Sequence, residues 1–200
     1  MKSRRLIGAE IMMRLRKFQM ILLFGAFFGA SSGVLGAPQD KPNLAELKKG
    51  IGLFESVLNQ SLAQEFVAPF ETLNRARGAY LPGYGVVFSF EVNLTPLQSL
   101  GPFSAAPTAK DEQTQHEQEV RRHDKAMKIA EQVLGDYGQS LTQLTPGEWV
   151  TIVIHTVAAH PDKIDRSTIV LSAEKKILDE RLTHAINQER FVQKLSKTEY

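Results

Sequence analysis

The sequence predicts an α+β fold in which three long helices pack on a small antiparallel or mixed sheet of three to four strands. Long stretches repeat their apolar residues every three or four positions, as amphipathic helices do. Shorter stretches alternate apolar and polar residues, as half-buried strands do. Their order is helix, strand or hairpin, helix, strand, strand, helix.

The first helix is predicted over residues 43–77. Its apolar residues fall on one face: Leu44, Leu47, Ile51, Phe54, Leu58, Leu62, Phe66, Phe70 and Leu73. Pro69 is expected to kink or divide it. Arg75 and Arg77 would lie in the last turn, and Gly78 would end the helix.

A turn and a strand are predicted next. Pro82-Gly83 suits the two central positions of a type II turn, because glycine adopts a positive φ without strain. Residues 86–94 then alternate as a half-buried strand does. Tyr80-Leu81 is expected to begin a partner strand or to lead into this one.

The second half of the chain is predicted to add one irregular connection and four elements. Residues 95–111 are rich in proline and small residues and lack a period. A long helix is expected over 111–144, where apolar residues repeat every seven positions. Strands are expected over 149–157 and 167–173 as an antiparallel pair, the first of them central in the sheet because both its faces are apolar. A last helix is expected over 174–196.

Residues 1–37 have the pattern of a secretory signal peptide. Six basic residues precede an uncharged stretch over 20–37 that ends in small residues. The mature chain is expected to begin somewhere from residue 34 to residue 38, and Met13 is an alternative start to Met1. In the alternative interpretation residues 20–37 stay as an uncleaved membrane anchor.

The remaining residues, 38–200, are predicted to form a single domain. Removing residues 1–37 takes away six of 24 basic residues and one of 22 acidic ones, which leaves 18 and 21 and a net charge of −3. This mildly acidic balance argues against nucleic acid as a partner. The chain has no cysteine, so disulfides, thiolate metal sites and cysteine catalysis are excluded.

The segment 75–85 is the most distinctive candidate for binding. Two arginines, Arg75 and Arg77, precede two tyrosines, Tyr80 and Tyr84, that flank the Pro-Gly turn. Such a turn can present aromatic rings and guanidinium groups to an anionic or carbohydrate ligand.

Histidines supply an alternative site. His155, His160 and Asp162 lie close in sequence, but no nucleophile is identified beside them. His116 and His123 share one helix face, where Glu119 stands four residues before His123, yet the HExxH spacing of zinc proteases is absent. No catalytic residue, metal or cofactor is therefore assigned.

We therefore expect an exported, non-catalytic binding or structural protein of the periplasm or cell envelope. Its partner would be an envelope protein or an anionic or carbohydrate ligand, and its oligomeric state is left open. The alternative is a secreted hydrolase, metal-assisted or not, that uses a histidine–carboxylate site.

Overall fold

The computed structural model describes residues 42–68, 70–96, 108–160 and 163–200. Residues 1–37, Asp162 and most of the connection 95–111 lie outside these ranges, so the predictions made for them stay predictions. None of the described helices combines the length and the apolar character needed to span a membrane.

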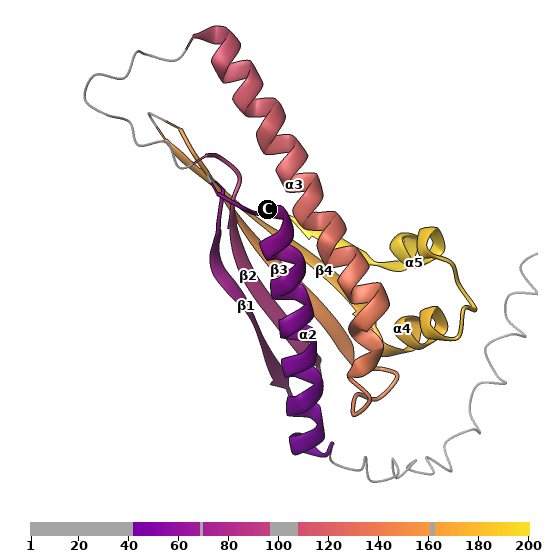
Figure 1. Ribbon diagram of the computed structural model, residues 1–200. Helices are drawn as coiled ribbons and strands as arrows, with labels where there is room; N and C mark the ends of the chain where they lie inside the picture. Colours follow the sequence, from indigo (N-terminus) through magenta and orange to yellow (C-terminus); the bar gives the residue numbers. More distant parts are fainter. Residues whose placement is uncertain (1–41, 69, 97–107, 161–162) are drawn as a thin grey trace, which may run out of the picture. The chain divides into compact units, whose positions relative to one another are not determined.

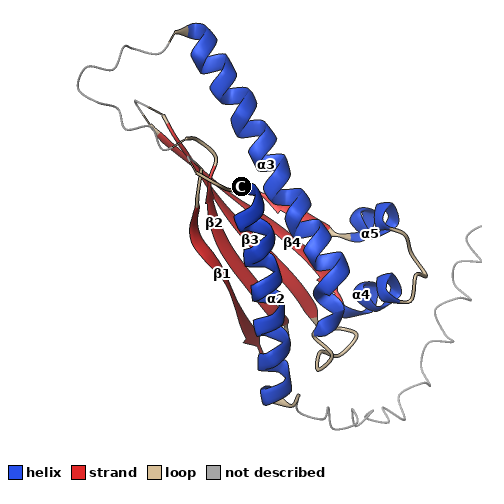
Figure 2. Cartoon of the chain, viewed as in Figure 1, coloured by secondary structure: helices blue, strands red, loops and turns tan. Residues whose placement is uncertain are grey.

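The described residues form an α+β fold with one mixed sheet (Figures 1 and 2). The helices are α2 (Leu44–Glu65), α3 (Ala109–Tyr137), α4 (Lys175–Leu182) and α5 (Gln188–Lys194), with a 3-10 turn at Gly138–Ser140. The strands are β1 (Thr72–Leu81), β2 (Gly85–Asn93), β3 (Trp149–Ala159), β4 (Ile164–Glu174) and β5 (Ser196–Glu199). The prediction of the fold class is thus confirmed in its coarse form, with one strand and one helix more than expected.

The sheet has the order β1-β2-β3-β4-β5. β1 and β2 form one antiparallel hairpin, and β3 and β4 form another. The two hairpins join through the parallel pair β2–β3, in which Phe88 lies beside Ile152. Because parallel neighbours need a crossover, α3 connects them. β3 is therefore the central strand, as predicted from its two apolar faces.

The core lies between the sheet and the helices α2 and α3, which cross one face of it in Figure 1. Phe54 of α2 and Phe88 of β2 stack there at a centroid distance of 4.1 Å, and neither is exposed to solvent. The core side chains of the three inner strands are Val86, Phe88, Phe90, Val92, Val150, Ile152, Ile154, Ile169, Leu171 and Ala173. Burial of these side chains is the main stabilising contribution in a chain without disulfides.

The prediction of one helix over 43–77 is wrong in its second half. α2 ends at Glu65, and residues 72–81 form β1, so Arg75 and Arg77 lie in a strand. The inward positions of β1 include Ala76 and Gly78, because bulkier side chains would not fit beneath α2. A Cβ atom on Gly78 would lie 2.5 Å from the Phe88 ring and 2.8 Å from Ile51.

The prediction of one helix over 174–196 is also wrong. The chain breaks after α4 at Thr183, and His184 adopts a positive φ of 56°. Asn187 then caps α5 by accepting a hydrogen bond from the Arg190 amide. The last residues add β5 to the sheet instead of continuing a helix.

Candidate functional site

The segment 75–85 forms the β1–β2 hairpin. Its turn has the predicted type II geometry, with φ of 79° at Gly83 and a 3.0 Å hydrogen bond from the Tyr84 amide to the Leu81 carbonyl. Gly85 also has a positive φ, 133°, and there the backbone of β3 comes so close that a Cβ atom would lie 2.0 Å from the Trp149 carbonyl oxygen. The two glycines thus let the hairpin join the sheet.

The hairpin separates the two predicted tyrosines. Tyr80 packs on the core side, where its hydroxyl donates to Glu148 at 3.0 Å. Burial and this carboxylate raise the pKa of Tyr80. The Tyr84 hydroxyl instead lies 2.6 Å from the Thr151 hydroxyl, on the face of the sheet opposite the helices. Tyr80 and Tyr84 therefore lie on opposite faces of the sheet, and Arg75 and Arg77 are exposed on β1.

The two histidines predicted to accompany Asp162 also lie apart. His155 is exposed on the face opposite the helices, where its Nδ1 lies 3.2 Å from the Thr168 hydroxyl. His160 contacts α3, and its Nε2 lies 3.4 Å from Asp165 while its Nδ1 lies 3.8 Å from Glu119. Lys163 and the more distant His160 together lower the pKa of Asp165. Each histidine therefore has its own partners.

The α3 histidines do not share a site either. His116 is exposed, whereas His123 reaches β5 and lies 3.1 Å from Glu199. The Ser167 hydroxyl donates to the same Glu199 oxygen at 3.1 Å. A nucleophilic serine would need contact with the histidine itself, but here the carboxylate stands between them. Among the described residues, no three histidine, aspartate or glutamate side chains could hold a metal ion.

A feature that the sequence did not reveal is a row of hydroxyls on the face of the sheet opposite the described helices, which runs from the β1–β2 turn across β3 to β4. The Tyr84 and Thr151 hydroxyls are linked at 2.6 Å, and Thr151 links to Ser172 at 2.8 Å. Trp149 precedes Thr151 by two positions in β3 and so lies on the same face. We name the three hydroxyl residues Tyr84, Thr151 and Ser172, together with the neighbouring Trp149, the hydroxyl row. Only the strand alternation of 149–157 and 167–173 could have indicated it, since the pairing register was unknown.

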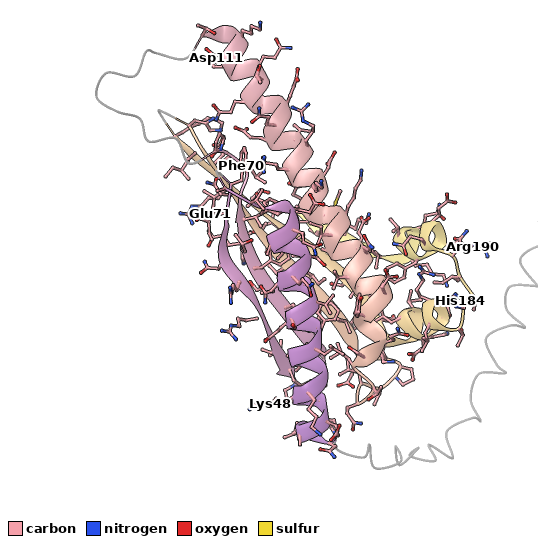
Figure 3. All side chains as sticks on the ribbon, in the orientation of Figure 1. Lys48, Phe70, Glu71, Asp111, His184 and Arg190 are labelled. Carbon is pink, nitrogen blue, oxygen red and sulfur yellow. The ribbon has the colours of Figure 1, made fainter. Side chains whose placement is uncertain are left out.

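The rest of this face is neither strongly apolar nor strongly charged. Val87, Val153 and Val170 are half-buried, and in the register of the sheet Ser89 and Thr198 flank the neighbours Val153 and Val170. Among the described elements, all helices pack on the opposite face or beside it. Figure 3 shows Arg190 on α5, and His184 in the connection between α4 and α5, beside α3. The described residues thus leave one face of the sheet uncovered.

In comparisons with known proteins, no protein-family model, no curated protein and no solved structure matches this chain.

Proposed function

We propose that this protein is an exported, non-catalytic binding module of the cell envelope, and that the hydroxyl row binds an envelope polysaccharide. The observation that carries the proposal is the pair of linked contacts Tyr84–Thr151–Ser172 beside Trp149. Aromatic rings offer a flat apolar surface with a polar edge, and hydroxyls can both donate and accept hydrogen bonds. This is the chemistry that a sugar ring, apolar on its faces and polar at its rim, requires.

The exposure of Tyr84 supports the same proposal. Tyr84 is 38% exposed, while Thr151 is only 3% exposed beneath it. The ring is therefore accessible and its hydroxyl is held in one direction by the strand below. Such a preorganised group loses little conformational entropy when a ligand binds.

The alternative, a secreted hydrolase, would need at least two histidines and a carboxylate in one pocket. His155 and His160 lie on opposite sides of β3, and His123 and His160 each contact different carboxylates. These separate positions favour the binding module over the hydrolase.

Binding is tested by co-sedimentation of the purified protein with insoluble peptidoglycan. The expected result is retention of the wild type and loss of most retention in Tyr84→Ala and Trp149→Ala. Tyr137→Ala is a matched control, because Tyr137 is 41% exposed on α3, away from the sheet face. Equal retention of Tyr137→Ala and Tyr84→Ala, or no retention of the wild type, would contradict the proposal.

Export is tested separately by N-terminal sequencing of the protein recovered outside the cytoplasm. A first residue between 34 and 38 is expected. Protein in the membrane fraction whose first residue precedes residue 20 would instead support the uncleaved membrane anchor.

A further inference from the structure

We propose that two copies of this chain associate through β5, which would join the two sheets into one continuous antiparallel sheet. Three features of the molecule support this association: the opposite edge of the sheet is covered, the β5 edge is uncovered in the described part of the chain, and the sequence of β5 is complementary to itself.

The β1 edge is covered by side chains of α2. The Asn59 amide donates to the Ala76 carbonyl at 3.1 Å and accepts from the Ala76 amide at 2.8 Å. Glu55 accepts a hydrogen bond from the Gly78 amide at 2.7 Å. These contacts take up backbone groups that another strand would need, so this edge is protected against strand addition.

The β5 edge lacks such protection. Tyr200 and Thr168 exchange both backbone hydrogen bonds, at 2.8 and 3.1 Å. In an antiparallel pair these two-bond positions recur every second residue, so Ser196 and Thr198 also bond to β4. The backbone groups of Lys197 and Glu199 consequently point away from β4, and residues 196–200 are all exposed. No backbone hydrogen bond within the described residues covers that outer side.

The sequence Ser-Lys-Thr-Glu can pair with a second copy of itself about a two-fold axis at Thr198. Lys197 then lies opposite Glu199 of the second copy, and Glu199 opposite its Lys197. Both pairs occupy positions whose backbone groups point outward, so each pair can form two backbone hydrogen bonds. Opposite charges directly across an antiparallel pair are stabilising, whereas like charges are destabilising.

The surrounding charges fit the same register. Within one copy, Lys197 contacts Glu131 of α3 at 2.5 Å and Glu199 contacts His123 at 3.1 Å. Across the axis, each Lys197 would thus lie between two carboxylates. Tyr200, whose side chain is 76% exposed, would lie opposite Ser196 of the second copy and lose solvent contact.

The interface consists of one short strand from each copy, so the association is expected to be weak. Small interfaces of this kind form weak complexes, with dissociation constants of about 1 µM or higher. The measurement is therefore sedimentation velocity of the purified 200-residue chain over a concentration series from about 1 µM to about 1 mM. The expected result is a reversible monomer–dimer equilibrium, and a monomer throughout the series would overturn the proposal.

Charge variants then test the register. Lys197→Glu alone and Glu199→Lys alone each place like charges opposite each other in a homodimer, so each is expected to be monomeric. Mixed together they restore two opposite-charge pairs, so an equimolar mixture is expected to form a heterodimer. The contacts with α3 that each variant loses are the same in the mixture as in the separate samples, so recovery on mixing can come only from the interface. A mixture that stays monomeric while the wild type dimerises would overturn the proposed register.

Cysteine cross-linking locates the axis, and the cysteine-free chain gives no background. Thr198→Cys places two sulfurs across a position where Cα atoms are about 4.5 Å apart, within the range for a disulfide. Ser196→Cys is the matched control on the same strand and face, because its two copies would lie about 14 Å apart at about 3.4 Å per residue. Rapid oxidation of Thr198→Cys to a covalent dimer is expected, with little for Ser196→Cys. Equal rates for the two variants would overturn the proposal.

Discussion

Asn59 of α2 forms two hydrogen bonds with the backbone of Ala76, one to the amide at 2.8 Å and one to the carbonyl at 3.1 Å. The register of β1 against β2 shifts between Asn74 and Arg77, so Ala76 lies in an irregular part of the strand. The side-chain amide of Asn59 takes the place of a neighbouring strand there. A helix residue thereby completes the hydrogen bonding of the sheet edge.

Replacement of Asn59 by alanine is expected to lower the free energy of unfolding by about 2 kcal/mol. The substitution removes two hydrogen bonds and leaves an amide and a carbonyl of a half-covered strand without partners. Urea denaturation measures the change. Gln60→Ala on the exposed side of the same helix should change stability by less than about 0.5 kcal/mol, and an equal loss in both variants would contradict the role of Asn59.

The glycines of the β1–β2 turn are expected to differ sharply in their tolerance of alanine. Gly85→Ala should cost about 3–5 kcal/mol, since it combines an unfavourable φ with a Cβ atom 2.0 Å from the Trp149 carbonyl. Gly83→Ala should cost about 1 kcal/mol, because nothing lies within 4 Å of its Cβ position and only the positive φ opposes it. Thermal unfolding of the two variants compares them, and similar losses would show that the close approach to β3 is not the cause.

The strands that the sequence predicted are those whose inward side chains are aliphatic or aromatic. Phe88 and Phe90 in β2, and Ile152 and Ile154 in β3, repeat every second residue and are buried. β1 lacks this signal because Ala76 and Gly78 occupy inward positions beneath α2. Periodicity therefore favoured a continuation of the helix, although Pro69 indicated an interruption.

β5 was missed for a different physical reason. Its inward side chains are Lys197 and Glu199, which meet Glu131 and His123 of α3 instead of the apolar core. A strand held by ion pairs has no hydrophobic alternation to detect. The candidate site could be predicted only in part. Tyr84 could be singled out from the sequence because it follows the Pro-Gly turn, whereas Thr151 and Ser172 become neighbours only through the strand register, which the sequence does not reveal.

The N-terminus of α3 is closed by a reciprocal cap between Thr108 and Asp111; Asp111 is labelled at that end of the helix in Figure 3. The Thr108 hydroxyl and amide donate to the Asp111 carboxylate at 2.6 and 2.9 Å, which lowers the pKa of that carboxyl. A lowered pKa means that the cap contributes above the pKa of unfolded aspartate, about 3.9, and is lost as pH falls through the folded value.

Thr108→Ala is therefore expected to raise the pKa of Asp111 toward its ordinary value and to fray the first turn of α3. Carbon NMR of the Asp111 carboxyl during an acid titration measures the pKa. Thr114→Ala removes a hydroxyl from the same helix that bonds only to the Lys110 carbonyl, so it should leave the Asp111 pKa unchanged. A shift in both variants would show that general helix loss, and not the cap, moves the carboxyl.

Alkaline pH is expected to abolish the stabilising contact between Tyr80 and Glu148. Burial first, and then the hydrogen bond and negative charge of Glu148, raise the pKa of the Tyr80 hydroxyl above that of an unfolded tyrosine. A raised pKa means that the contribution of the neutral hydroxyl is fully present below about pH 10, the value for an unfolded tyrosine, and is lost as pH rises through the folded value.

Tyr80→Phe should consequently be less stable than the wild type at pH 8 by about 1 kcal/mol, the worth of one hydrogen bond. The difference should shrink above pH 10, because ionised Tyr80 would face the Glu148 carboxylate while phenylalanine would not. Urea denaturation of both proteins from pH 8 to pH 11 measures the difference at each pH. A difference that stays constant across this range would show that Tyr80 and Glu148 are not coupled in the folded protein.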